Sequence, residues 1–432
     1  MISRTLARRP ATALALAALL LWMAAAPAEA TNGYLVHGIG TRAKALAGAG
    51  VAFPQDALAG GTNPAGMALV GKRYDVGVAL FSPSREYTVT GGPSLLPSTF
   101  GLTPGTVESD SKAFFVPNFG ANWQVTPRQA LGLLVYGQGG MNTDYPAATF
   151  YGTRPTGVDL SQLFVVPTWA VGAADGRHAF GIGLIAAYQT FEIQGVQAFG
   201  GFSADPARLT NNGADTSTGF GARLGYLGRW NALSFGLAYQ SEISMEEFDE
   251  YAGLFAGRGG FDIPANYTVG VAWRFGGGAV FLLDYQEIFY SEIESVGNPL
   301  FPALGRAFQG DAGGMLGADA GPGFGWRDME VIKAGVQWGA APWVWRLGFS
   351  TGDQPIPETE MMFNILAPGI MEEHFTGGFT RELSGGKAIS LALMVAPSSS
   401  ISGPNPMEMP GMQTIELEMS QWELELGFSW GF

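Results

Sequence analysis

The chain has 432 residues, no cysteine and a formal net charge of −14. The acidic balance argues against nucleic acid, whose binding depends on basic patches. The absence of cysteine excludes a disulfide-stapled domain and any cysteine-based metal or thiol chemistry. Charged residues make up 14% of the chain, against roughly a quarter in a typical soluble domain, and 64 residues are glycine. This composition fits a membrane β-barrel better than a soluble enzyme.

Residues 1–30 have the features of a secretory signal peptide. Arg4, Arg8 and Arg9 precede an uncharged run over residues 11–26, and Ala28-Glu29-Ala30 supplies small residues for cleavage. We therefore expect an exported protein whose mature chain begins at Thr31. No other uncharged apolar run approaches the length of a membrane-spanning helix.

Residues 31–72 lack strand-like alternation and are rich in small residues. Asn63, Pro64, Ala65 and Gly66 form a turn-like stretch within them. One interpretation is a loose periplasmic tail. The other, which we expect, is a plug folded into the lumen of a barrel, where small side chains allow close packing against the wall.

From residue 73 onward, apolar and polar residues alternate with the period of a β-strand. Fourteen such segments are predicted, at residues 73–89, 111–126, 129–141, 166–174, 178–196, 216–228, 232–244, 263–275, 279–294, 328–338, 343–351, 373–383, 388–395 and 418–432. Short turns alternate with long loops rich in glycine, proline and asparagine, which is typical of outer-membrane barrels with periplasmic turns and external loops. We therefore predict that residues 73–432 form a closed antiparallel 14-stranded transmembrane β-barrel.

The last strand is the clearest. Between residues 422 and 432, three large aromatic and two leucine side chains precede the terminal Phe432 on one face, which suits a bilayer better than a soluble β-sandwich. We expect this strand to close the barrel against residues 73–89. Residues 415–419 have the opposite parity. Either a bulge lies near Ser420 and Gln421, or the upstream piece belongs to the last outer loop.

Several short motifs follow one another along the mature chain, and each of them alone is weak evidence for a family. They are Gly40 with Ala43, Ala47-Gly48-Ala49, Asp56, Asn63-Pro64-Ala65-Gly66, Tyr136-Gly137, Gly140, Asp144-Tyr145, residues 263–272, Leu283-Asp284-Tyr285, Trp326-Arg327-Asp328, Arg346-Leu347-Gly348, Pro355, Pro357 and residues 374–378. Because the motifs occur in this order, the chain resembles the FadL/TodX-type (OmpP1-like) family of outer-membrane transporters of long-chain fatty acids and hydrophobic compounds.

The resemblance implies a hatch, residues 31–72, that fills the lumen of the barrel. Ligand would be captured in an apolar groove among the outer loops, and hatch movement would then release it sideways at a kinked third strand. The hatch motif residues implied are Asn63, Pro64, Ala65 and Gly66, and the kink of the lateral gate is placed at Gly137, Gly139 and Gly140. Glycine permits such a bend, although these glycines could equally serve tight packing against the hatch.

A fatty-acid carboxylate requires an arginine or lysine within reach. The ligand-contacting candidates are the inward-facing Arg274, Arg223, Lys333 and His374, with Phe363 in an outer loop. The alternative is that these cations pair with lumenal aspartates and glutamates, which outnumber them. Glu423 and Glu425 of the last strand are expected to place negative charge beside the hatch or in the lumen. A lumen with an excess of carboxylates would tolerate a neutral hydrocarbon better than a fatty anion, so both substrate classes stay open.

Enzyme chemistry has weak support in the sequence. Residues 427–431 match G-x-S-x-G, but the nucleophile elbow needs a strand, a sharp turn and a helix, whereas Ser429 lies inside a predicted strand. The three histidines are too scattered for a metal site, and His374 is the one plausible base for a barrel lipase. We therefore expect no catalytic residue, metal or cofactor. A general porin for hydrophilic solutes is the main alternative function, and an outer-membrane barrel lipase a weaker one.

These inferences predict an exported monomer in the outer membrane of a Gram-negative cell. Its partners would be a hydrophobic small molecule or fatty acid and the surrounding outer-membrane lipid, without nucleic acid. The resemblance further implies that Phe432 is a signal to the barrel-assembly machinery.

Overall fold

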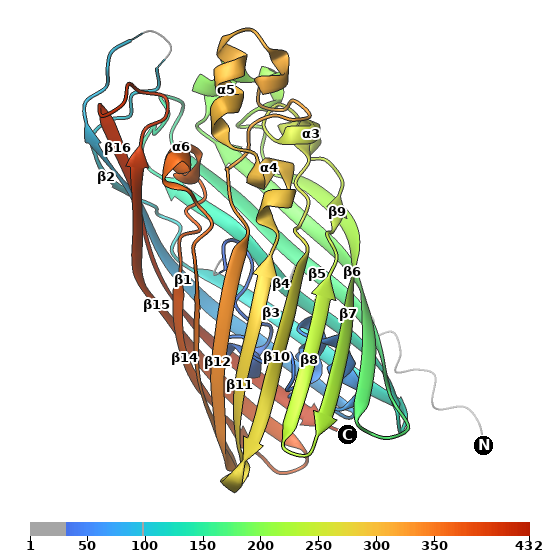
Figure 1. Cartoon of the computed structure of the whole chain (residues 1–432). Helices are drawn as coiled ribbons and strands as arrows, with labels where there is room; N and C mark the ends of the chain where they lie inside the picture. The colour runs from blue at the N-terminus through green and yellow to red at the C-terminus, as the bar shows by residue number, and fades with distance from the viewer. Residues whose placement is uncertain (1–31, 97–98) are drawn as a thin grey trace, which may run out of the picture.

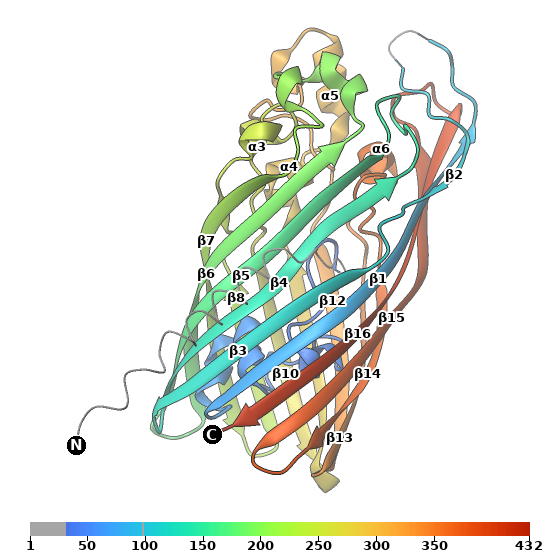
Figure 2. The same cartoon turned by 180° about the vertical axis from the view of Figure 1, so that it is seen from behind.

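The computed structural model describes residues 32–96 and 99–432, so the predicted signal peptide lies outside the described residues. Within them the chain forms a closed antiparallel barrel (Figures 1 and 2). Its fourteen long strands in the described part are β1 (Arg73–Gly91), β3 (Phe114–Thr126), β4 (Gln129–Tyr145), β5 (Thr156–Gly172), β6 (His178–Gln194), β7 (Asp215–Trp230), β8 (Leu233–Gln240), β10 (Asn266–Phe275), β11 (Ala279–Ile288), β12 (Met329–Ala340), β13 (Trp343–Gly352), β14 (Glu373–Glu382), β15 (Lys387–Pro404) and β16 (Gln413–Gly431). β16 pairs with β1 from Arg73 opposite Gly431 to Gly91 opposite Gln413, which closes the barrel as predicted.

Shorter elements lie in the N-terminal segment, in one turn and in the outer loops. The segment contains α2 (Thr41–Lys44), η1 (Ala57–Gly61) and η2 (Pro64–Ala68), and the turn contains η6 (Gly276–Gly278). The loops contain β2 (Gly105–Glu108), β9 (Ser244–Met245), η3 (Gln197–Phe202), η4 (Pro206–Arg208), η5 (Asp249–Tyr251), α3 (Ala256–Gly259), η7 (Tyr290–Glu292), α4 (Glu294–Gly297), α5 (Leu300–Phe308), η8 (Ala312–Gly314), η9 (Glu358–Glu360) and α6 (Met361–Asn364). None of the helices in the described part of the chain is long and apolar enough to cross a membrane.

The outer face of the barrel wall carries an apolar belt. Along β16, Trp422, Leu424, Leu426 and Phe428 are exposed, while the residues between them are buried inside the barrel. Exposed aromatic side chains also gather near the ends of the short turns: Trp230, Trp273, Phe275, Trp338 and Trp343. An apolar band with aromatic residues at its edge is the lipid-facing surface of an outer-membrane barrel.

The change of polarity within β16 comes neither from a bulge in β16 nor from a separate loop, the two alternatives left open by the sequence. The parity of β16 is unbroken, because Ile415, Leu417 and Met419 face inward like the polar residues that follow them. The register shift lies instead in its neighbour β15, between Ala396 and Ser399. Above the bilayer belt, water lies outside the wall and the apolar core of the loops lies inside, so the apolar face is reversed without a change in register.

The same reversal explains the two largest errors in the predicted strand boundaries. β5 begins at Thr156 and β15 continues to Pro404, about ten residues beyond each predicted limit. Toward the outer ends of these extensions the outward face is polar, as at Asp159 and Ser161 of β5 and Ser400 and Ser402 of β15, so the lipid-facing pattern is missing there. β11 ends at Ile288 because the following residues Tyr290, Ile293 and Val296 recur every three positions, which buries them beneath the loops in helical turns.

The N-terminal segment, residues 32–72, lies inside the barrel (dark blue in Figures 1 and 2) and most of its side chains are buried. Several wall glycines allow its backbone to approach closely. A Cβ atom added at Gly348 would lie 2.3 Å from the carbonyl carbon of Leu46, and one at Gly181 would lie 2.3 Å from that of Pro64. The segment and the wall therefore fit together through backbone contacts that larger wall residues would prevent.

We expect Gly348→Ala to displace the N-terminal segment. The new Cβ would lie 2.3 Å from the backbone carbonyl carbon of Leu46, and a backbone cannot move aside as a flexible side chain could. The variant should keep the circular dichroism of a β-barrel and conduct small ions in planar bilayers better than the wild type. Gly172→Ala is the matched control, since its Cβ would lie 3.7 Å from the nearest atom. Equal conductance in the two variants would contradict this account of the fit.

Candidate transport site

The second and third wall strands separate part of the way up the barrel. β3 and β4 pair between Thr126 opposite Gln129 and Asn118 opposite Tyr136, and no higher. Above this point β3 pairs with β1 alone and β4 with β5 alone. The register of β4 against β5 also shifts between Gly137 and Gly139. A gap without main-chain pairing thus separates residues 114–117 of β3 from the upper part of β4.

The start of the N-terminal segment covers this gap from inside. The Val36 amide donates to the Gln138 carbonyl at 2.9 Å, and the Gly140 amide donates to the Tyr34 carbonyl at 2.9 Å. Leu35 forms a β-bridge with Gly139 between these two bonds. Residues 34–36, which we call the arm, therefore provide some of the backbone partners that β3 withholds from β4.

The three glycines that we placed at the kink lie at this junction. A Cβ atom at Gly139 would lie 1.8 Å from the Tyr34 carbonyl oxygen, so glycine is needed there for the arm to approach. A Cβ at Gly137 would lie 2.9 Å from a methyl group of Val116 across the foot of the gap. Gly140 contributes its amide to the arm. The wall irregularity and the arm contact thus share one site.

An apolar cavity lies among the outer loops above the arm. Ser295 is the sole polar side chain among its described lining residues, which are Phe191, Ile193, Val196, Phe199, Leu209, Leu254, Phe255, Ser295, Leu316, Pro322, Gly323, Phe324, Phe363 and Leu366. Phe363, a predicted ligand contact, packs edge-on against Phe199 with ring centroids 5.1 Å apart. The lining is apolar and offers almost no hydrogen bonds.

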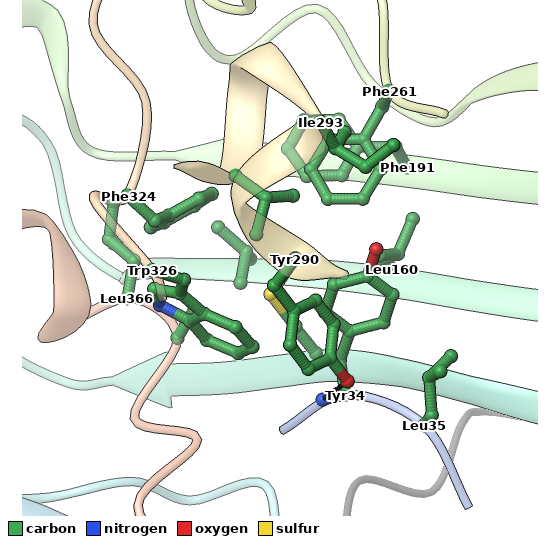
Figure 3. Close-up of a cluster of buried hydrophobic side chains, with 14 of the residues drawn as sticks. Tyr34, Leu35, Leu160, Phe191, Phe261, Tyr290, Ile293, Phe324, Trp326 and Leu366 are labelled. Atoms are coloured by element: carbon green, nitrogen blue, oxygen red, sulfur yellow. Dashed lines mark hydrogen bonds between the residues drawn. The ribbon is translucent and has the colours of Figure 1, made fainter. Parts of the chain in front are cut away.

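An aromatic cluster connects the loop core to the arm (Figure 3). The Tyr34 ring lies 5.1 Å from Tyr290, 5.7 Å from Trp326 and 5.9 Å from Phe261, measured between centroids. The Tyr290 hydroxyl accepts a hydrogen bond from the Tyr34 amide at 3.3 Å. Tyr34 therefore has its ring in the aromatic cluster and its carbonyl in the gap of the wall. The sequence analysis named Trp326 only within a family motif and did not identify Tyr34 or Tyr290, although the three-residue spacing after Tyr290 was a usable signal.

Arg223 and Lys333 are buried and hold the backbone of the N-terminal segment. The Lys333 ammonium donates to the His37 carbonyl at 3.0 Å. The Arg223 guanidinium donates to the Gly61 carbonyl and, at 3.1 Å, to the Tyr136 hydroxyl. Both line a polar chamber between the segment and the wall.

The lumenal acids have a partner that we did not expect. Lys44 of the N-terminal segment forms ion pairs with Glu423 at 2.9 Å and Glu425 at 3.1 Å. The acidic pair of β16 therefore binds the segment, and Arg223 and Lys333 are not its partners.

Two further candidates lie elsewhere in the lumen. Arg274 is near the short turns, over the ring of Phe53 at 5.5 Å and 3.2 Å from the Ser234 hydroxyl. The His374 ring stacks on His37 at 5.9 Å, and its Nδ1 lies 3.2 Å from the Ser350 hydroxyl. The structure does not bring either residue to the apolar cavity, so ligand contact by them stays a prediction.

The Asn63 motif forms the start of η2 and joins it to the wall. The Asn63 side chain accepts from the Ala65 amide at 3.0 Å and donates to the carbonyls of Val51 and Tyr226. Pro64 occupies the first turn of η2, where its missing amide is not needed. A Cβ at Gly66 would lie 2.6 Å from Pro54. The motif thus fixes one bend of the N-terminal segment.

The G-x-S-x-G match lies in the regular strand β16, without the turn and helix of a nucleophile elbow. The Ser429 hydroxyl accepts a hydrogen bond from Arg42 at 3.1 Å. Ser429 is therefore part of the contact with the N-terminal segment.

Glu360 joins two of the loops around the apolar cavity. Its carboxylate accepts from the Leu300 amide of α5 at 2.9 Å, and its carbonyl accepts from Asn364 of α6. Asn364 in turn accepts from the Trp326 indole at 2.6 Å. Burial raises the pKa of Glu360 to about 7. The buried site therefore favours the protonated carboxyl.

We expect loop docking to weaken as pH rises from about 4.5 to 7. In that window the folded state holds a proton that the unfolded state has lost, so folding stability falls with pH. Glu360→Gln mimics the protonated form, so its melting temperature should match the wild type at pH 4 and exceed it at pH 8. Glu358→Gln, at an exposed glutamate of the same turn, is the control. A Glu360→Gln difference that does not change with pH would contradict the assignment.

Comparison with known proteins identifies the family. Residues 17–368 match the family model described as outer membrane protein transport protein (OMPP1/FadL/TodX). A search of curated protein sequences gave no significant match. Among solved structures, a Pseudomonas aeruginosa FadL homologue is 14% identical with a TM-score of 0.67, covering 93% of this chain and 100% of that chain. The Ralstonia pickettii toluene transporter TbuX is 19% identical with a TM-score of 0.61, covering 92% and 99%.

The Pseudomonas putida toluene transporter TodX is 15% identical with a TM-score of 0.65, covering 93% of this chain and 100% of that chain. At these identities the structural likeness establishes the barrel fold. The family model spans most of the sequence, and the chain therefore belongs to the OMPP1/FadL/TodX family of outer-membrane transport proteins.

Proposed function

We propose that this protein is an outer-membrane channel for passive uptake of hydrophobic molecules, either hydrocarbons or long-chain fatty acids. Cargo enters the apolar cavity among the outer loops, the N-terminal segment acts as a hatch, and cargo leaves sideways between β3 and β4. The observation that carries this proposal is the position of Tyr34. Its ring belongs to the aromatic cluster beside the loop core, and its carbonyl bonds to β4 at the gap.

Capture by the cavity needs no chemistry beyond burial. Each methylene removed from water contributes about 0.8 kcal/mol, so twelve give roughly 10 kcal/mol before the entropic cost of binding. The apolar lining of the cavity favours a neutral hydrocarbon. The similarity of the whole chain to toluene transporters and to a monoaromatic hydrocarbon channel supports the same cargo.

Release requires the arm to move while the rest of the hatch stays in place. The later part of the hatch is held by wall acceptors: Asp284 binds the Gly50 and Val51 amides at 2.7 and 2.9 Å, and Asp75 binds the Ala57 amide at 2.8 Å. The arm has two backbone bonds to the wall, each stabilising by about 1 kcal/mol net. Gly40, with φ of 83°, is a suitable hinge between the two parts.

The main alternative, a general porin, differs in what the intact protein conducts. We expect the wild type to resist small ions in planar bilayers and to pass toluene into lipid vesicles. Deleting residues 36–65 should open an ion-conducting pore and abolish selective uptake of toluene, because the lumen then lacks its filling. Free ion conduction by the intact protein would favour the porin.

The lateral route can be tested with a disulfide, because the chain has no cysteine of its own. Val116→Cys with Gly137→Cys places two thiols across the foot of the gap, where a Cβ at Gly137 lies 2.9 Å from a Val116 methyl. Oxidation should fasten β3 to β4 and lower toluene uptake at least about tenfold, and reduction should restore it. Each single-cysteine variant is a control. Full uptake by the oxidised form would exclude this exit.

A further inference from the structure

Arg85 is a buried cation that the transport path described above does not use. It lies on β1 with its side chain inside the barrel and 3% of its surface exposed. Among the described residues, none accepts a hydrogen bond from its guanidinium, and one terminal nitrogen is fully enclosed. This sets Arg85 apart from Arg223 and Lys333, which are equally buried but bind carbonyls of the hatch.

No carboxylate faces Arg85 from the elements around it in the described structure. The nearby Glu86, Glu108 and Glu418 form cross-strand pairs on the opposite face of the wall. On the inner face its surroundings are Met419, opposite it on β16, and the rings of Tyr87 and Tyr145, which contact each other edge-on at 4.9 Å. An unpaired buried guanidinium is costly, and its planar fork of donors matches a carboxylate.

Arg85 lies at the outer end of the gap between β3 and β4. The Arg85 carbonyl accepts from the Ser109 amide at 2.8 Å, and the Ser109 hydroxyl accepts from the Asp144 amide at 2.9 Å. Because Asp144 is near the end of β4, these bonds close the gap at its outer end. Lower down, Phe81 of β1 lies opposite Phe114, the first residue of β3. Arg85 is thus inside the barrel, at the outer end of the opening.

We propose that Arg85 receives the carboxylate of an anionic amphiphile while its alkyl tail passes into the gap between β3 and β4. This inference rests on the lateral route of the proposed function. It adds Arg85 as the residue that binds the carboxylate of a fatty acid on that route. The charged head is then held toward the cell exterior and the tail lies along the apolar belt. This is the orientation of a lipid in the outer leaflet, so the cargo leaves the barrel without inverting.

The experiment compares dodecanoate with dodecanol, which has the same chain length and no charge. Binding to the full-length protein in lipid nanodiscs is measured by calorimetry at pH 8. Arg85→Met should weaken dodecanoate binding by about tenfold or more, the loss expected for a charge-assisted hydrogen bond, and leave dodecanol binding within about twofold. Arg85→Lys keeps the charge without the fork and should give an intermediate loss.

Two controls separate this role from general electrostatics and from a structural role. Lys112→Met removes an exposed cation near the same outer end, 48% exposed and paired with Glu108, and should leave both affinities unchanged. The melting temperature of Arg85→Met should equal or exceed that of the wild type, because an unpaired buried charge has been replaced by an apolar side chain.

Unchanged dodecanoate affinity in Arg85→Met, or equal losses for dodecanoate and dodecanol, would overturn the proposal. So would a wild type that takes up toluene but does not bind dodecanoate, an outcome that leaves the proposed channel function intact. If the oxidised variant with Val116→Cys and Gly137→Cys passes toluene at the full rate, the proposed lateral exit is wrong. If Arg85→Met does not fold, Arg85→Lys is the deciding variant. A dodecanoate affinity equal to that of the wild type in Arg85→Lys would then overturn the proposal.

Discussion

A strand edge inside a membrane needs a partner for every backbone amide and carbonyl, since the hydrocarbon offers none. β4 lacks such a partner on one side above Tyr136, where β3 turns away to pair with β1 alone. The arm supplies part of what is missing, through the carbonyl of Tyr34 and the amide of Val36. The wall gap and the lumenal segment are therefore one feature, because the opening in the barrel is stable in lipid only while something inside covers it.

The polar interior of the wall is organised around the N-terminal segment. Carboxylates of the wall accept backbone amides of the N-terminal segment, as Asp284 and Asp75 do, while lumenal cations such as Lys333 donate to its carbonyls. The ion pairs of Lys44 with the glutamates of β16 follow the same principle. Closely packed wall glycines complete the fit. The result is a lower body of the segment that is bound to the wall at many points.

The sequence was a good guide wherever the bilayer imposes its own pattern. Alternation and the difference between short turns and long loops were enough for the closed 14-stranded barrel. They failed for β5 and β15 above the bilayer, where water faces the outside and the apolar side turns inward. Parity correctly placed Arg223 and Lys333 inside, but it could not name their partners, because a backbone carbonyl leaves no trace in the sequence. The contact of Tyr34 with Tyr290 joins residues 256 positions apart and has no local signature.

The position of Tyr34 also limits which cargo can open the proposed hatch. A ligand shifts a conformational equilibrium only by the difference between its affinities for the two states. A molecule that fits the cavity without disturbing the aromatic cluster binds both states equally and stays trapped, however tightly it is held. Opening needs a cargo that gains contacts when the Tyr34 ring leaves Tyr290 and Trp326, ring contacts that stabilise by about 1 kcal/mol each. Cargo size relative to the cavity, more than affinity for it, then decides transport, because an apolar molecule too large for the loop pocket must extend toward the arm and displace it.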